Sequence, residues 1–143
     1  MFTIRKAVLP DHPGIIRLLK ELDLYYADLI LLDFWIAEEL NNIIGTVQLA
    51  NHKDFFFLGS LGVAPPYQKK GIGTALLKET IKNARKDIYL YTIIPEYFRK
   101  FGFQVTAPSP DLPSKDRYEC ADCHLEKCVC MVKPFQNQKG NKG

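Results

Sequence analysis

The spacing of hydrophobic residues predicts alternating strands and helices in the first third of the chain. Residues 2–6 alternate between apolar and polar side chains, which is typical of a strand. Apolar residues then recur at helical spacing over residues 15–22, and Asp11 precedes them as a candidate helix cap. The apolar stretch 23–33 fits either a helix or a loop.

The next two apolar runs predict a β-hairpin. Residues 34–40 and 43–49 form its arms, and Asn41-Asn42 forms a two-residue turn that tolerates positive φ. Gly45 in the second arm indicates a bulge or a close approach of another segment. Residues 55–63 are apolar enough for a fourth strand that is buried on both faces.

The remaining pattern predicts helices and strands in alternation. Residues 73–86 show an amphipathic helical pattern, and residues 88–94 form a fifth strand. Pro95 begins a short helix that Gly102 ends, and residues 131–135 form a last strand. The order of elements therefore predicts a mixed α/β fold.

The composition fits one globular domain. The chain has 143 residues, of which 47% are hydrophobic and 24% are charged. We expect residues 1–135 to form one domain with a cysteine-rich element at 118–131, and residues 136–143 to form a disordered tail.

Charge and hydropathy narrow the functional classes. A net charge of +3 is too small to indicate a nucleic-acid or membrane-surface partner. No apolar run approaches the roughly 18 residues of a spanning helix. No hydrophobic segment of a signal peptide follows the basic pair Arg5-Lys6, so we expect a cytoplasmic protein.

A glycine-containing segment carries the clearest chemical signal. The apolar strand ending at Val63 is followed by Gln68-Lys69-Lys70-Gly71-Ile72-Gly73, and a helical pattern begins at once. This arrangement directs free backbone N–H groups and a helix dipole to one point, where an anion is favoured. The Gly-Lys-Ser/Thr of a P-loop and the G-x-G-x-x-G of a Rossmann fold are both absent. An ordinary tight strand-to-helix connection is the alternative for such a short motif.

The same segment resembles the acetyl-CoA signature of the GNAT superfamily of N-acetyltransferases. The likeness lies in Q-x-x-G-x-G followed by T-A-L-L, after a strand that ends L-G-V-x-P. It implies a mostly antiparallel twisted sheet with splayed central strands and flanking helices. In that family the loop holds the coenzyme pyrophosphate, and the splayed strand pairs with the pantetheine. The residues that the resemblance assigns to the coenzyme are Leu61, Gly62, Val63, Gln68, Lys69, Lys70, Gly71, Ile72, Gly73, Thr74 and Phe98.

The C-terminal third is similar to small N-acetylglutamate-synthase-like amino-acid acetyltransferases. The shared features are Thr92 on the fifth strand, the pair Tyr97-Phe98 before F-G-F, Leu112-Pro113, and a C-x-x-C element. The resemblance implies acetyl transfer from acetyl-CoA to a small amine such as an amino acid.

Two acid–base positions of the family are occupied by apolar residues. The fourth strand often carries a glutamate base, but residues 55–58 are Phe-Phe-Phe-Leu here. A tyrosine acid often lies four residues before the Gly of G-F, where this chain has Phe98. A phenylalanine can neither accept nor donate a proton, so both roles need other groups. The neighbouring candidates are Tyr97, Glu96, Glu39 and His52, each of which also has an ordinary structural explanation.

Four cysteines indicate a second candidate site, which could bind a metal. Cys120 and Cys123 form a C-x-x-C turn that could hold zinc, with Cys128 and Cys130 following it. The last two sulfurs lie about 6.6 Å apart along an extended strand, so His124 is an alternative ligand. Free thiols, a disulfide or an iron–sulfur cluster are the other readings of the same residues.

These observations leave several functions open. The first is an acetyl-CoA-dependent N-acetyltransferase acting on a small-molecule amine, with zinc as a further candidate ligand and a homodimer as a candidate assembly. The alternatives are an acetyl-CoA-binding module with weak or no catalysis, a protein N-acetyltransferase, and a partner-binding domain that uses the cysteine element.

Overall fold

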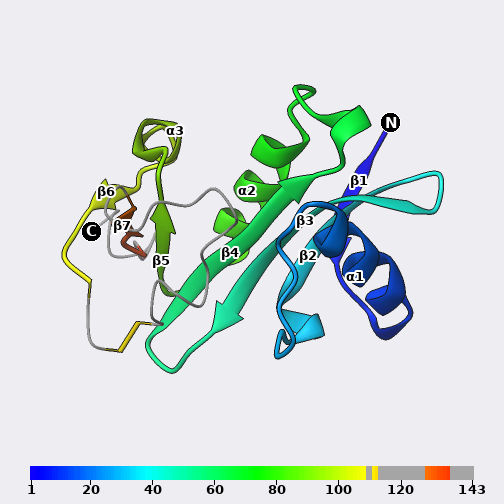
Figure 1. Cartoon of the computed structure of the whole chain (residues 1–143). Helices are drawn as coiled ribbons and strands as arrows, with labels where there is room; N and C mark the ends of the chain where they lie inside the picture. The colour runs from blue at the N-terminus through cyan, green and yellow to red at the C-terminus, as the bar shows by residue number, and fades with distance from the viewer. Residues whose placement is uncertain (109–110, 113–127, 136–143) are drawn as a thin grey trace.

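A seven-stranded mixed sheet with helices on both faces forms the described part of the chain (Figure 1). The computed structural model describes residues 1–108, 111–112 and 128–135. The strands are β1 (Thr3–Lys6), β2 (Phe34–Glu39), β3 (Asn42–Asn51), β4 (Phe55–Val63), β5 (Asp87–Thr92), β6 (Gln104–Val105) and β7 (Val129–Lys133). The α-helices are α1 (His12–Glu21), α2 (Ile72–Asn83) and α3 (Pro95–Arg99), with short 3-10 helices η1 (Leu9–Asp11), η2 (Leu31–Asp33) and η3 (Pro65–Tyr67). The predicted α/β class is confirmed.

The sheet opens between its two central strands. Its order is β1-β2-β3-β4-β5-β7-β6, and every pair except β4–β5 is antiparallel. The parallel pairing joins only Phe55–Phe57 of β4 to Asp87–Tyr89 of β5. Beyond these residues β4 continues to Val63 without a described partner on that side, and the two strands diverge (Figure 1). The splay that the family resemblance implies is therefore present.

Helices α1 and α2 cover opposite faces of the sheet. Ile15, Leu18 and Leu19 recur at helical spacing in α1 and are buried, and the first and last of them pack with Phe34 and Ile36 of β2. On the other face, the apolar side of α2 packs with β3, β4 and β5 in a second cluster. Phe98 of α3 belongs to the same cluster. The two clusters bury both faces of the sheet.

Asp11 does not cap α1 as the sequence predicts. Its backbone is already helical, and its carboxylate makes no capping bond to α1. Instead it accepts two hydrogen bonds from the Arg5 guanidinium, at 2.8 and 2.9 Å, and one from the Val8 N–H at 2.8 Å. These bonds to the charged carboxylate lower the pKa of Asp11 and raise the pKa of Arg5. The aspartate thus joins β1 to η1 rather than starting the helix.

The predicted hairpin is present, but its turn lies one residue earlier. Glu39 pairs with Asn42, so the two turn residues are Leu40 and Asn41, with φ of 52° and 67°. Two successive positive φ values are typical of a type I′ turn. The prediction for Gly45 is confirmed, since a Cβ there would lie 3.0 Å from Leu76 Cδ1 of α2, and the β2–β3 register shifts beside it.

Strand β4 is less buried than its apolar sequence predicts. Only Phe57 and Leu58 are buried, and the other seven residues are intermediate. From Gly59 to Val63 the splay leaves β4 without a neighbouring strand on one side. A register shift in the β3–β4 pairing accompanies Ser60, whose φ is 52° and whose carbonyl accepts a 3.0 Å hydrogen bond from Thr46 Oγ1. The bulge bends β4 where it leaves β5.

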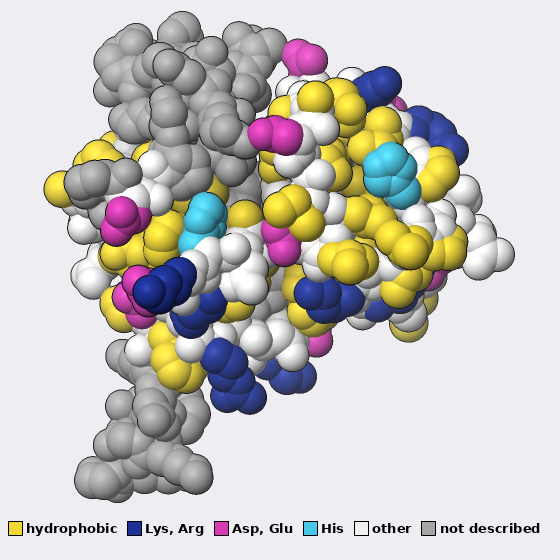
Figure 2. Space-filling model, turned by 90° about the horizontal axis from the view of Figure 1, so that it is seen from below, with side chains coloured by type: hydrophobic (Ala, Val, Ile, Leu, Met, Phe, Trp, Pro, Cys, Tyr) yellow, Lys and Arg dark blue, Asp and Glu magenta, His cyan; other side chains and the backbone are white. Residues whose placement is uncertain are grey.

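The surface seen from below is apolar on the side of α1 and η2 (Figure 2). Exposed large hydrophobic side chains in this region are Val8, Leu9, Ile30 and Leu32. The glycine segment lies at the opposite, upper end of the molecule (Figure 1). No helix in the described part of the chain is both long and apolar enough to cross a membrane.

Candidate functional site

The glycine segment forms a tight loop between the end of β4 and the start of α2. Gln68 Nε2 donates a 2.9 Å hydrogen bond to the Val63 carbonyl, which ties the loop to the strand. Lys69 and Gly71 both have left-handed backbones, with φ of 64° and 83°. Because left-handed residues reverse the chain sharply, α2 can begin at Ile72, directly beside the splayed strand.

The N-terminus of α2 is able to bind an anion. Gly71 occupies the capping position, and no side chain there makes a capping hydrogen bond. The first backbone N–H groups of α2 therefore lack helical partners and point along the positive end of the helix dipole. They face a cavity of about 240 Å³, lined by Val63, Tyr67, Gln68, Lys69, Gly71, Ile72, Gly73, Thr74 and Tyr97.

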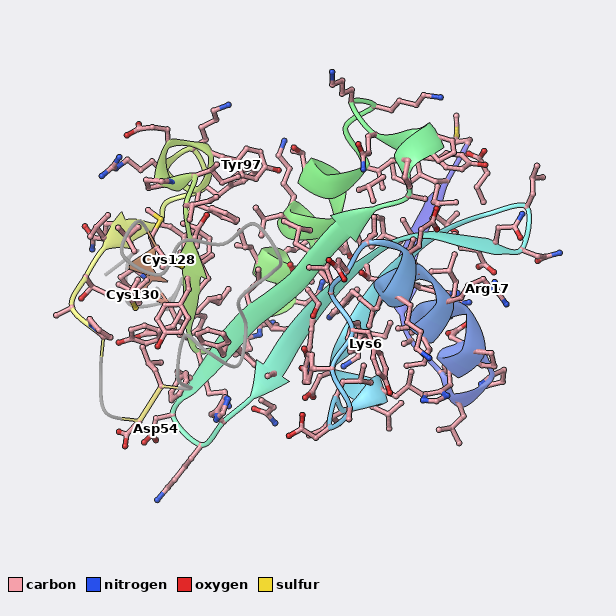
Figure 3. All side chains as sticks on the ribbon, in the orientation of Figure 1. Lys6, Arg17, Asp54, Tyr97, Cys128 and Cys130 are labelled. Atoms are coloured by element: carbon pink, nitrogen blue, oxygen red, sulfur yellow. The ribbon has the colours of Figure 1, made fainter. Side chains whose placement is uncertain are left out.

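Tyr97 closes the cavity from the other side of the splay. It lies on α3 and points toward the N-terminal end of α2 (Figure 3). Its hydroxyl is 3.0 Å from Thr74 Oγ1, while its ring contacts Phe98 and Phe101 edge-on. Tyr97 is therefore both a core aromatic and a cavity-lining hydroxyl, and the sequence offered these roles only as alternatives.

Most of the residues that the resemblance assigns to the coenzyme lie together at this cavity. Four do not line it. Leu61 and Gly62 lie further down β4, and Lys70 is exposed, with its ammonium 5.7 Å from the Tyr67 ring centre. Phe98 is only 6% exposed and packs on Phe103 in the core.

Tyr67 is a lining residue that the sequence analysis did not single out. It ends η3, where its N–H donates a 2.8 Å hydrogen bond to the Ala64 carbonyl. The two prolines before Tyr67 indicate a turn. Its place directly before Gln68, the first residue of the glycine segment, could have identified it as a lining residue.

Glu96 does not reach the cavity. It lies on the outer side of α3, where its side chain is 84% exposed and pairs with Arg99. Glu39 pairs with the N-terminal amine at 3.2 Å, and His52 stacks on Phe55 at the β3–β4 turn. Of the four acid–base candidates, the structure brings only Tyr97 to the glycine loop.

The face of the sheet opposite α2 is aromatic at the base of the splay. Phe57, which occupies the region of the family's glutamate, is 1% exposed and contacts the Tyr91 ring edge-on at 5.2 Å. Phe55 meets Tyr89 in the same way at 5.4 Å. Burial raises the pKa of Asp33, which lies in η2, against a hydrogen bond from the Asn51 backbone.

The predicted metal ligands are only partly within the described residues. Cys120, Cys123 and His124 lie outside them. Cys128 and Cys130 are buried at the start of β7, 8% and 3% exposed (Figure 3). In the part of the chain that the structure describes, no group of three or more His, Cys, Asp or Glu side chains could hold a metal ion. The zinc site stays a prediction.

Comparison with known proteins gives a consistent family. Residues 31–105, just over half of the chain, match the family described as Acetyltransferase (GNAT) domain. A Drosophila melanogaster protein described as probable N-acetyltransferase san is 30% identical over 96 residues, which are 57% of this chain and 49% of that protein.

Two solved structures show the same fold. One is N-acetylglutamate synthase from Neisseria gonorrhoeae in complex with coenzyme A and L-arginine, with a TM-score of 0.71 and 26% identity over 95% of this chain and 34% of that one. The other is Arabidopsis thaliana Naa50 in complex with the bisubstrate analogue CoA-Ac-MVNAL, with a TM-score of 0.71 and 20% identity over 94% and 99% of the two chains. The chain spans about half of the Drosophila relative and a third of the synthase. The family match, the splayed sheet and the glycine loop agree: this chain belongs to the GNAT acetyltransferase superfamily.

Proposed function

We propose that the chain is an acetyl-CoA-dependent N-acetyltransferase whose acceptor is the primary amine of a small molecule, such as an amino acid. The observation that carries the proposal is the uncapped N-terminus of α2 facing a cavity beside a strand that has left its partner. The helix N–H groups and the Lys69 ammonium suit a pyrophosphate. The open edge of β4 suits the amide groups of pantetheine, which can pair with it like a short strand.

In the proposed reaction, the acceptor nitrogen attacks the thioester carbonyl carbon. A C–N bond forms and the C–S bond breaks. The nitrogen gives up one proton to water, and the coenzyme thiolate takes up one proton and leaves as a thiol. Backbone N–H groups of β4 beyond Phe57 would stabilise the negative charge that develops on the carbonyl oxygen. Tyr97 is the proposed proton donor to the thiolate, because it is the one acid–base candidate that α3 brings to the splay.

Calorimetry with acetyl-CoA tests the first part of the proposal. We expect a dissociation constant below about 100 μM, on the order of −5.5 kcal/mol. Gly73→Asp places a carboxylate at the anion site and should weaken binding at least about tenfold. Gly73→Ala is the matched control, since its Cβ would lie 3.7 Å from Val63 Cγ2, an ordinary contact. No binding to the wild type at millimolar coenzyme would refute the proposal.

A thiol-release assay tests the catalytic part. The acceptors are amino acids, polyamines and peptides with free N-termini. Tyr97→Phe should lower kcat about 100-fold and leave coenzyme affinity within about threefold. A kcat that is unchanged in this variant would remove Tyr97 from the mechanism.

Two other functions have specific support. Phe57 and Phe98 stand where relatives carry acid–base groups, which favours a coenzyme-binding module with little catalysis. Tight coenzyme binding without turnover on any amine would establish that module. The likeness to Naa50, whose structure holds the bisubstrate analogue CoA-Ac-MVNAL, favours a protein N-acetyltransferase, which peptide acceptors in the same assay would reveal.

A further inference from the structure

Gln48 is a buried polar residue in the middle of β3 that the proposed chemistry leaves unused. Gln48 is 3% exposed. It stands opposite Phe34 of β2, which packs in the α1-side cluster, and residues directly opposite one another in a sheet project to the same face. The Gln48 side chain therefore lies on the face opposite α2 and the coenzyme cavity.

One end of the Gln48 amide is already occupied. Tyr26, in the segment between α1 and η2, donates its hydroxyl to Gln48 Oε1. The amide orientation is thereby fixed, and the two N–H donors of Nε2 remain. No group in the described residues accepts a hydrogen bond from Nε2. No fully buried side-chain nitrogen or oxygen in that part of the chain lacks a partner, so Nε2 lies at an accessible edge.

This unused donor lies at the base of the splay. Gln48 pairs with Gly59 of β4, which is two residues beyond Phe57, the last residue that β4 pairs with β5. Gly59 adds no side chain beside the amide. From Gly59 to Val63 at the coenzyme cavity is four residues, about 13 Å along a strand. The amide is thus separated from the anion site by the length of the open strand edge.

The segment that carries Tyr26 is held against the same strand. A Cβ on Gly62 would lie 2.6 Å from Leu22 Cδ1 and 3.0 Å from Leu24 Cδ1, so both leucines pack where β4 has no side chain. The segment therefore forms a wall over the open part of β4, and Tyr26 fixes the donor at its foot.

We propose that Gln48 Nε2 donates a hydrogen bond to a carbonyl or carboxylate oxygen next to the reacting amine of the acceptor. The acceptor is then an α-amino acid or the N-terminal residue of a peptide, rather than a simple alkylamine or polyamine. Tyr26 acts as a positioning residue through Gln48. The inference rests on the proposed acetyl transfer, and it adds the chemical class of the acceptor.

The test compares two amines that differ in one group. L-Alaninamide carries a carboxamide with the carbonyl oxygen, whereas isopropylamine has a methyl group in place of that carboxamide. The readout is the ratio of kcat/KM for these two acceptors, measured in each variant, so the difference between their amine pKa values cancels when variants are compared. Gln48→Met, which keeps the side-chain length, should lower this ratio about 10- to 100-fold, because a site that hydrogen-bonds its substrate discriminates strongly. Gln104→Met, at an exposed glutamine of β6, is the matched control and should leave the ratio unchanged.

A second variant tests the positioning role. Tyr26→Phe should raise KM for alaninamide several-fold while kcat and KM for acetyl-CoA stay near wild type, which a general loss of folding would not produce. Free L-alanine and the peptide Ala-Ala-amide then separate the two sources of the carbonyl oxygen. If the enzyme accepts both equally, only the first residue of the acceptor lies in the site.

Failure of the inference and failure of the proposed function are distinguishable. A wild type that transfers to both amines, with a ratio that Gln48→Met does not change, overturns the inference and leaves acetyl transfer standing. A wild type that transfers to no amine refutes the catalytic proposal. The inference is then tested by NMR titration of coenzyme A-saturated protein with alaninamide. Binding that Gln48→Met weakens about tenfold supports it, and unchanged or absent binding overturns it.

Discussion

The left-handed backbone of Lys69 predicts that two small substitutions at one position will differ in stability but not in coenzyme affinity. Lys69 has a φ of 64° and lines the cavity. A residue with a Cβ loses about 1–2 kcal/mol in this conformation, and glycine does not. Glycine also gains freedom in the unfolded chain, which offsets about 0.4–1 kcal/mol. Lys69→Gly should therefore be more stable than Lys69→Ala by about 0.5–1 kcal/mol.

Both variants remove the same ammonium group from the anion site. We expect each to weaken acetyl-CoA binding about fivefold to tenfold, since Lys69 is exposed and its charge is partly screened. The loss should shrink in about 1 M salt, where screening acts within roughly 3 Å. Lys70→Ala, next to it and outside the cavity, is the control and should change affinity less than about twofold.

Thermal unfolding and calorimetry provide the two measurements. For a chain of this size, a difference of about 0.5–1 kcal/mol corresponds to a Tm difference of roughly 2–3 °C between Lys69→Gly and Lys69→Ala. Equal Tm values would show that the backbone at this position is not strained. Wild-type affinity in both variants would show that the Lys69 charge does not act on the coenzyme.

Three further predictions concern other parts of the fold. Gly71→Ala should destabilise the chain by about 0.5–1 kcal/mol in urea unfolding, because φ is 83° although no atom lies within 4 Å of the added Cβ; an unchanged midpoint would contradict this. The pKa of Asp11 is lowered by Arg5, so the stability that it contributes is present above its unfolded pKa and lost as pH falls through the folded pKa. Asp11→Asn should reduce the loss of stability as the pH falls below the ordinary range of carboxylate titration, and a slope identical to the wild type would count against the ion pair. Gly62→Ala should raise KM for the acceptor more than KM for acetyl-CoA by displacing Leu22, which steady-state kinetics can separate.

Residues adjacent in sequence predicted the coenzyme site better than they predicted the catalytic groups. The glycine loop and the start of α2 follow from residues adjacent in sequence, so the motif was sufficient to place Gln68 to Thr74 together. Tyr97 is different, because its position depends on how far β5 diverges from β4, which no local pattern encodes. The burial of Phe98 could not be predicted either, because it depends on how α3 packs on Phe103, which lies outside the helix.

The predicted boundaries of the elements were wrong where two interactions compete for the same residues. The sequence favours Asn41-Asn42 for the hairpin turn, yet the pairing of β2 with β3 moves the turn to Leu40, a residue that rarely adopts positive φ. Asp11 looked like a cap because aspartate is one of the residues preferred at helix N-caps, but Arg5 competes for the carboxylate from the neighbouring strand. Strand β6 has only two residues and no periodicity that could reveal it.

The position of β7 between β5 and β6 has a consequence for the order in which the molecule is assembled during synthesis. β7 pairs with residues about 40 positions earlier in the chain, at Ile88–Thr92, and with both residues of β6. Every described residue that lines the cavity precedes residue 98, so the ribosome releases the binding loop well before β5 pairs with β7. Until residue 133 emerges, one edge of β5 is open to water and to other chains. A nascent chain stalled before residue 129 should therefore be more sensitive to protease at α3 than one stalled well beyond residue 135, even with coenzyme present.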